Sequence, residues 1–118
     1  MISSSSDGAI KIKSIQFKGR IKRTEGDEYV EITNSGDSPA DISGYKVTAG
    51  NRQSFVLPAK SVLEPGKSVR VYTNFDDAAT GGLSFNSKTA IWNNKGDAGE
   101  LLDTSAKVIS RYAYGSRA

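Results

Sequence analysis

The stretch EYVEITN at residues 28–34 decides the fold class of this chain. Its apolar residues, Val30 and Ile32, alternate with residues that belong on the other face, and a period of two is typical of a strand with one buried face. A turn-forming run at residues 34–37 ends the stretch, and Pro39 follows it. We therefore predict a strand that places Val30 and Ile32 in the core.

Similar short runs extend from this stretch toward both ends of the chain. They alternate apolar and polar residues, turn residues separate them at close intervals, and apolar residues do not recur at helical spacing. This pattern is typical of an all-β sandwich or barrel. It predicts about eight or nine short strands, within residues 10–17, 28–33, 45–49, 55–57, 62–63, 69–72, 90–92, 100–102 and 108–114.

Three local features refine this prediction. The alternation changes parity between Ile12 and Ile15, which predicts a β-bulge between them. Pro65-Gly66 has the residues that a type II turn requires. We also expect a turn at residues 93–97 and a hairpin loop at residues 103–107.

Length and composition indicate one globular domain. A length of 118 residues is typical of a single domain, and 36% hydrophobic with 25% charged residues is ordinary for a folded, soluble chain. We predict the domain at residues 9–115, after a flexible Ser-rich linker or chain start at residues 1–8 and before a short tail at residues 116–118. No apolar run approaches the roughly 18–20 residues that cross a bilayer.

The residue types present exclude much catalytic chemistry. The chain has no Cys and no His, which excludes disulfides, zinc sites built on thiolate or imidazole, and His-based triads. Glu28 and Glu31 are expected on opposite faces of a strand, so they cannot converge as a carboxylate pair. Residues 93–97 with Glu100 offer oxygen ligands but lack the alternating Asp residues of a calcium loop. We predict no enzyme activity, no cofactor and no metal site.

Several segments together carry a family resemblance: residues 28–34, 43–45, 55–58, 63–72, 92–97 and 101–108. In this order and spacing, the chain resembles the lamin-tail domain, found in nuclear lamins and in many prokaryotic surface or secreted proteins, and its motifs resemble the prokaryotic branch. The resemblance implies an immunoglobulin-like β-sandwich. The motif residues it marks as structural are Val30, Ile32, Asn34, Gly44, Tyr45, Phe55, Pro65, Gly66, Trp92, Asn93, Gly96, Asp97 and Leu101.

The chain also departs from the family. Tyr45 stands where the family usually has Trp, so an aromatic ring is kept. The coiled-coil rod of lamins is absent, and the chain ends Gly115-Ser116-Arg117-Ala118, without a prenylation signal. A filament-forming role is therefore not carried over.

The resemblance implies a non-catalytic interaction or anchoring module. Such a module belongs to a larger, exported or cell-surface protein and binds a protein or a cell-envelope component. We expect the isolated domain to be a monomer. A passive spacer between neighbouring domains is the alternative.

A basic segment raises a second alternative, nucleic-acid binding. Its members are Lys11, Lys13, Lys18, Arg20, Lys22 and Arg23, and no acidic residue lies between Gly8 and Glu25. These side chains could contact phosphates and give salt-dependent affinity. The competing reading is a solvated edge strand, where Lys prevents edge-to-edge pairing. Nearby acidic residues, Glu28 and Glu31 among them, would partly cancel the field.

The aromatic residues are expected to pack. Trp92 is the only tryptophan, and core packing is the usual role of such a residue in a sandwich. Tyr72, Tyr112 and Tyr114 could form an exposed stripe, but cross-strand pairing is the favoured interpretation. Phe17 is predicted to point into the core.

Overall fold

A computed structural model describes residues 9–16, 28–49, 53–73, 83–85, 91–92 and 96–115. These ranges contain ten strands: β1 (Ile10–Gln16), β2 (Tyr29–Asn34), β3 (Ala40–Asp41), β4 (Lys46–Ala49), β5 (Gln53–Val56), β6 (Val62–Leu63), β7 (Ser68–Tyr72), β8 (Leu83–Ser84), β9 (Gly96–Leu102) and β10 (Val108–Gly115). The predicted all-β class is confirmed. The strand number exceeds the prediction because β3 and β8 have only two residues each, too few to show alternation in the sequence.

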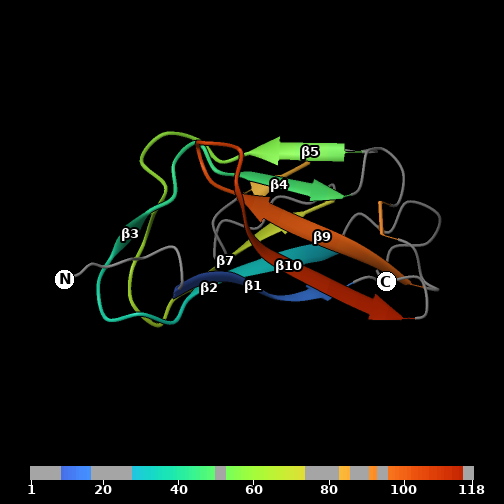
Figure 1. The fold of residues 1–118 in the computed structure, drawn as a ribbon, viewed down its shortest axis with the longest axis horizontal. Coiled ribbons are helices and arrows are strands. Elements are labelled where there is room, and N and C mark those ends of the chain that lie inside the picture. Colours follow the sequence, from blue (N-terminus) through green and yellow to red (C-terminus); the bar gives the residue numbers. More distant parts are fainter. Residues whose placement is uncertain are drawn as a thin grey trace.

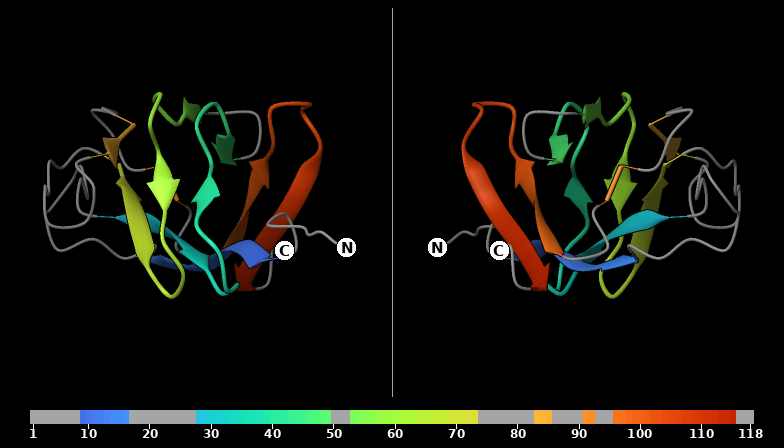
Figure 2. Two further views of the ribbon diagram at one scale, coloured as in Figure 1. Left: turned by 90° about the vertical axis from the view of Figure 1, so that its left-hand side faces the viewer. Right: turned by 90° about the vertical axis from the view of Figure 1, so that its right-hand side faces the viewer.

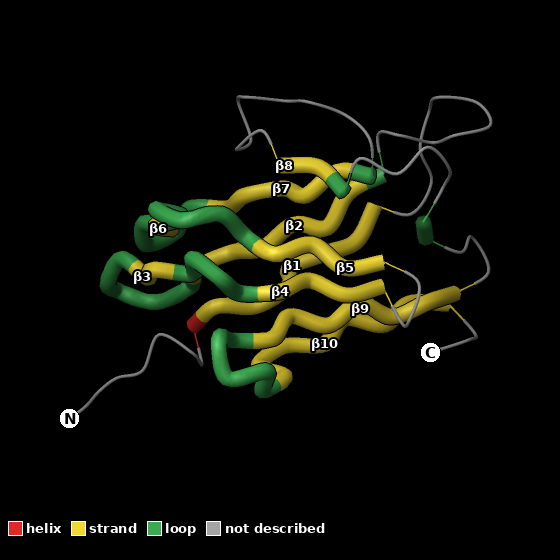
Figure 3. The backbone as a smooth tube through the Cα atoms, turned by 90° about the horizontal axis from the view of Figure 1, so that it is seen from above, coloured by secondary structure: helices red, strands yellow, loops and turns green. Residues whose placement is uncertain are grey.

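The strands form two four-stranded sheets, in the orders β1-β2-β7-β8 and β10-β9-β4-β5 (Figure 1). The sheets pack face to face as an immunoglobulin-like sandwich. Neighbouring strands are antiparallel except for β7 and β8, which are parallel. A separate two-stranded ribbon, β3-β6, lies at one end of the sandwich (Figure 3).

The core lies between the two sheets, as the alternation predicts. Val30 and Ile32 of β2 are fully buried, while Glu31 between them is half-buried on the outer face. The opposite sheet contributes Val47 and Leu101, which are also fully buried. Burial of each such side chain stabilises the fold by about 1.5–3 kcal/mol relative to leaving it in water.

The predicted local features are present. The pairing of β1 with β2 shifts register between Ile12 and Ser14, which is the predicted bulge. Gly66 has a φ of 75°, and the Lys67 N–H donates to the Glu64 carbonyl at 3.1 Å, as in a type II turn. The loop between β9 and β10 is closed by Asp103, whose Oδ1 accepts from the N–H of Ser105 and of Lys107.

Two predictions in the last third are wrong. Gly96 and Asp97 are not in a turn but begin β9, because β10 continues to Gly115 and pairs with them. Ile91 and Trp92 are not in a strand, although both are buried. Phe17 and Asn93 lie outside the described residues.

The two lateral sides of the sandwich differ (Figure 2). On one side β1 lies beside β10, and the Ile12 N–H donates to the Ser110 hydroxyl at 3.0 Å. We call this the closed side. On the other side the sheets end in β5 and β8, which are not paired with each other. We call the gap between β5 and β7-β8 the open side.

Candidate functional site

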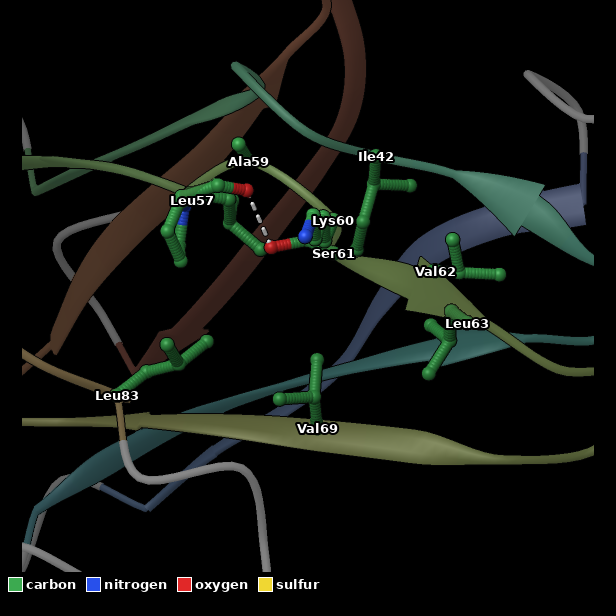
Figure 4. A pocket seen from close by; sticks show the side chains of 10 residues that line it. Ile42, Leu57, Ala59, Lys60, Ser61, Val62, Leu63, Val69 and Leu83 are labelled. Atoms are coloured by element: carbon green, nitrogen blue, oxygen red, sulfur yellow. Dashed lines mark hydrogen bonds between the residues drawn. The ribbon is translucent and has the colours of Figure 1, made fainter.

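The open side contains an apolar pocket (Figure 4). Its volume is about 260 Å³. Val69 of β7 and Leu83 of β8 form one wall, and Leu57, which follows β5, lies opposite them. Side chains from the β3-β6 end close it, namely Ile42, Val62 and Leu63. The pocket therefore lies where the two sheets and the ribbon meet.

Hydrogen bonds hold the pocket wall at residues 57–61 in place. The Leu57 N–H donates to the Tyr45 carbonyl at 2.8 Å, and the Leu57 carbonyl accepts from the Gly44 N–H at 2.9 Å. The Ser61 hydroxyl donates to the Pro58 carbonyl at 2.6 Å, the dashed line in Figure 4. The Ser61 N–H donates to the Ser43 hydroxyl at 2.9 Å. These contacts form the pocket without a ligand.

Exposed apolar side chains gather beside this pocket. Among the described residues, the large hydrophobic side chains that are exposed are Val56, Val62 and Val108, at 54%, 52% and 44%. Val56 ends β5 and Val62 lines the pocket, so two of the three belong to the open side. Phe55 contacts Phe85 edge-to-face at 6.0 Å and links β5 to the residue after β8. An apolar surface of this kind is typical of an interaction site.

Asn34 joins the turns at the ribbon end. Its side chain is fully buried, and its Nδ2 donates to the carbonyls of Ser38 and Leu63, both at 2.8 Å. Its Oδ1 accepts from the Gly36 N–H at 2.9 Å, and its backbone carbonyl accepts from the Gly66 N–H at 2.7 Å. Asn34 therefore fixes β6 at the end of β2.

The other predicted motif residues have structural positions as well. Gly44 has a φ of 79°, a conformation that favours glycine, and is the third residue of the turn from Ile42 to buried Tyr45, whose N–H donates to the Ile42 carbonyl at 3.1 Å. Trp92 is in the core, as predicted, and Phe55 of β5 is partly buried against the same core. Leu101 is fully buried in β9.

The family model for the Lamin Tail Domain matches residues 3–116, nearly the entire chain. The chain belongs to the lamin tail domain family. No protein of curated function matches it in sequence. The family is one of immunoglobulin-like structural domains, which agrees with the fold described above.

This lamin tail domain contains a buried carboxylate that the sequence patterns missed. Glu28 is fully buried, and its Oε1 accepts from the Thr73 hydroxyl at 2.9 Å and from the backbone N–H of Ile91 and Trp92 at 3.0 and 3.4 Å. Glu28 therefore links Thr73 and residues 91–92 at the start of β2. The sequence does contain a signal for this burial. Glu28 is two and four residues from Val30 and Ile32, so a continuous strand directs its side chain to the same buried face.

The outer face of β2 and β7 carries a connected polar cluster. The Arg70 guanidinium lies 4.1 Å from the ring centre of Tyr29, and its Nε donates to Glu31 at 3.1 Å. Its Nη1 donates to the Tyr72 hydroxyl at 3.0 Å, and this bond is the main cause that raises the pKa of Arg70. Tyr29 and Tyr72 form an edge-to-face pair at 5.3 Å across the paired strands.

The favoured interpretation of Tyr72, cross-strand pairing, is confirmed, and the alternative of an exposed stripe does not hold for this residue. Tyr72 is only 4% exposed. Tyr112 and Tyr114 are half-buried against the core.

The structure describes part of the basic segment in this lamin tail domain. Lys11 and Lys13 are exposed on β1, and the Lys13 ammonium lies 3.7 Å from Glu31. Lys18, Arg20, Lys22 and Arg23 lie outside the described residues. Nucleic-acid binding by this segment therefore stays a prediction.

Searches for two further kinds of site cover only the described ranges. Within these ranges, no three acidic side chains come together as metal ligands. Over the same ranges, no helix is long and apolar enough to cross a membrane.

Proposed function

We propose that this lamin tail domain is a non-catalytic protein-interaction module whose docking surface is the open side. The observation that supports this most is the pocket beside β5, with the exposed side chain of Val62 in its lining and that of Val56 at the end of β5. Apolar side chains in this arrangement cost little to desolvate and give a partner an anchor point. A passive spacer would have no use for them.

Site-specific photo-crosslinking tests this function. A photo-reactive residue in place of Val62, in the full protein made by its own cells, should form a discrete adduct with one partner, identified by mass spectrometry. The adduct should disappear when Val56→Glu is added, because a carboxylate at the interface would have to be desolvated on docking. The matched control carries the photo-reactive residue in place of Val108, an exposed valine of β10. Equal adducts from both positions, or none from either, would favour the spacer.

The proposal includes a larger, exported or cell-surface protein as the setting, as the family resemblance implies. Fractionation of the producing cells tests this part. Recovery of the protein in the envelope or medium is the expected result, and recovery only in the cytoplasm would contradict it.

A further inference from the structure

We propose that the partner is an acidic, extended segment of another protein, which adds to β5 as a new strand and inserts an apolar side chain into the pocket. This inference rests on the proposed function and specifies the class of partner. Three features of the open side support it: a free strand edge, a pocket of limited size and an excess of positive charge.

The outer edge of β5 is available for strand pairing. β5 is the last strand of its sheet, and no described strand pairs with its outer edge. Leu57 directs both its N–H and its carbonyl at residues 44–45. Backbone groups of successive residues point to opposite edges, so those of Val56 and then Ser54 point outward. An added strand could therefore form ladder hydrogen bonds with Ser54 and Val56.

The pocket fits one side chain better than a separate small molecule. Its volume of about 260 Å³ lies below the roughly 300–1,000 Å³ of ordinary ligand sites. It begins at Leu57, directly after the free edge, and is lined by apolar side chains such as Val69 and Leu83. A strand on β5 would point alternate side chains toward and away from this interior. One large apolar residue in the right register would enter the pocket.

The charge around the edge selects an acidic segment. Residues 42–63, which flank β5 in sequence, contain Lys and Arg but no Asp or Glu, and the adjoining acids Asp41 and Glu64 are exposed at the ribbon end, in β3 and after β6. Lys46 and Lys60 are exposed on either side of Val56 in sequence, and Lys60 lines the pocket. Among the described carboxylates none forms an ion pair with either lysine, and Glu100, two strands away, is 3.9 Å from Arg111. Glu or Asp in the bound strand could therefore form ion pairs with these two lysines.

A second copy of this chain fits the edge less well. Pairing of two β5 strands about a two-fold axis would place Lys46 and Lys60 of both copies around one interface. Their charges would add there with no acidic residue from residues 42–63 to balance them, and the chain already carries a net charge of +3. A nucleic acid would supply negative charge but neither a strand edge nor an aliphatic side chain for the pocket.

Selection from a random peptide library tests the inference. The immobilised full chain is exposed to displayed peptides of about ten residues, the length of a long strand. Enriched peptides should contain more Glu and Asp than Lys and Arg around one large apolar residue. Enrichment of basic peptides, or the absence of any enrichment relative to a Val62→Glu chain, would overturn the inference.

Matched variants then locate the binding. The double change Lys46→Glu with Lys60→Glu should lower the affinity of the chain for an enriched peptide about tenfold or more. Lys11→Glu with Lys107→Glu makes the same change in net charge at exposed lysines elsewhere, and it should leave the affinity within about twofold. Bound peptide should slow hydrogen exchange at the amides of Ser54 and Val56. Slowing at other amides only, or equal weakening by both charge reversals, would contradict strand addition at β5.

The two proposals fail in different ways. If the crosslink from position 62 forms but the adduct survives Lys46→Glu with Lys60→Glu, the open side binds a partner of other chemistry and this inference falls alone. If positions 62 and 108 give the same crosslinks, the proposed function itself falls.

Discussion

The closed and open sides of the sandwich are made from the edges of the same two sheets. They differ in whether the backbone groups of the edge strands have partners among the described residues. On the closed side, the Ser110 hydroxyl accepts the Ile12 N–H, and Ile15 lies against Trp92 in the core. Gly99 permits this closeness, because a Cβ there would lie 3.0 Å from Trp92 and 3.1 Å from Ile15. On the open side, no described strand pairs with the outer edge of β5, and the space between the sheets forms a pocket. The comparison shows one side closed by packing and a hydrogen bond, and another side with a pocket and a strand edge that no described strand covers.

Truncation of one aliphatic side chain on each side should show the largest difference. Ile15→Ala should lower the free energy of unfolding by about 3 kcal/mol, because Ile15 is 5% exposed and its removal leaves a cavity. Leu83→Ala should cost only about 1 kcal/mol, because Leu83 is half-buried and lines a space that already exists. Denaturant titration measures both. Equal losses would show that the open side is as tightly packed as the closed side.

Glu28→Gln should have the next largest effect. Glu28 holds the backbone of Ile91 and Trp92, and so keeps the indole in the core near Ile15. The Gln amide keeps one oxygen acceptor but adds an NH₂ group among the donors of Ile91, Trp92 and Thr73, and this should lower the free energy of unfolding by about 2 kcal/mol. Trp92 is the only tryptophan, so its fluorescence reports the transition directly.

The control for Glu28→Gln is Glu31→Gln on the outer face. Its partners, Arg70 and Lys13, are partly exposed, so the change should cost less than about 1 kcal/mol. A cost for Glu31→Gln equal to that for Glu28→Gln would show that the buried carboxylate does not fix the closed side.

The sequence predicted the features that depend on neighbouring residues. Alternation placed Val30 and Ile32 in the core, the parity change located the β1 bulge, and the residues of Pro65-Gly66 predicted the turn. Each of these is determined within a few residues, where side-chain direction and backbone preference act directly.

The open side could not be predicted in this way. The pocket depends on which edges of the two sheets come together, and residues 57 and 83 are brought opposite each other only by the strand order. β8 has only two residues, so it leaves no alternating pattern in the sequence. Trp92 lies between these two cases. Its burial could be predicted because tryptophan usually packs in a core, but its backbone conformation depends on Glu28, which is distant in sequence.

Ser110→Ala should distinguish the two edges by a smaller amount. It leaves the Ile12 N–H without its acceptor, and we expect a loss of about 1 kcal/mol and faster hydrogen exchange at Ile12. In the unchanged chain, the Ile12 amide should exchange more slowly than the amide of Val56, at an edge with which no described strand pairs. NMR-detected exchange measures both amides. Equal protection at Ile12 and Val56 would remove the distinction between a closed and an open edge.

Ser43→Ala should give the smallest effect, a change in titration at the rim of the open side. The Ser43 side chain and N–H both bond Asp41, and they hold the pKa of its carboxyl below the ordinary value of 3.8. The stabilisation this provides is present above pH 3.8 and is lost as the pH falls through the lower pKa of the folded state. Alanine removes the hydroxyl but keeps the N–H, so the pKa of Asp41 should rise only part of the way to 3.8. Carboxyl-detected NMR titration measures it, with Ser54→Ala, an exposed serine of β5, as the control that should leave Asp41 unchanged. If Ser43→Ala also leaves the pKa of Asp41 unchanged, the Ser43 hydroxyl does not connect β3 to the pocket wall at Ser61, and the open side is less rigid than its hydrogen bonds indicate.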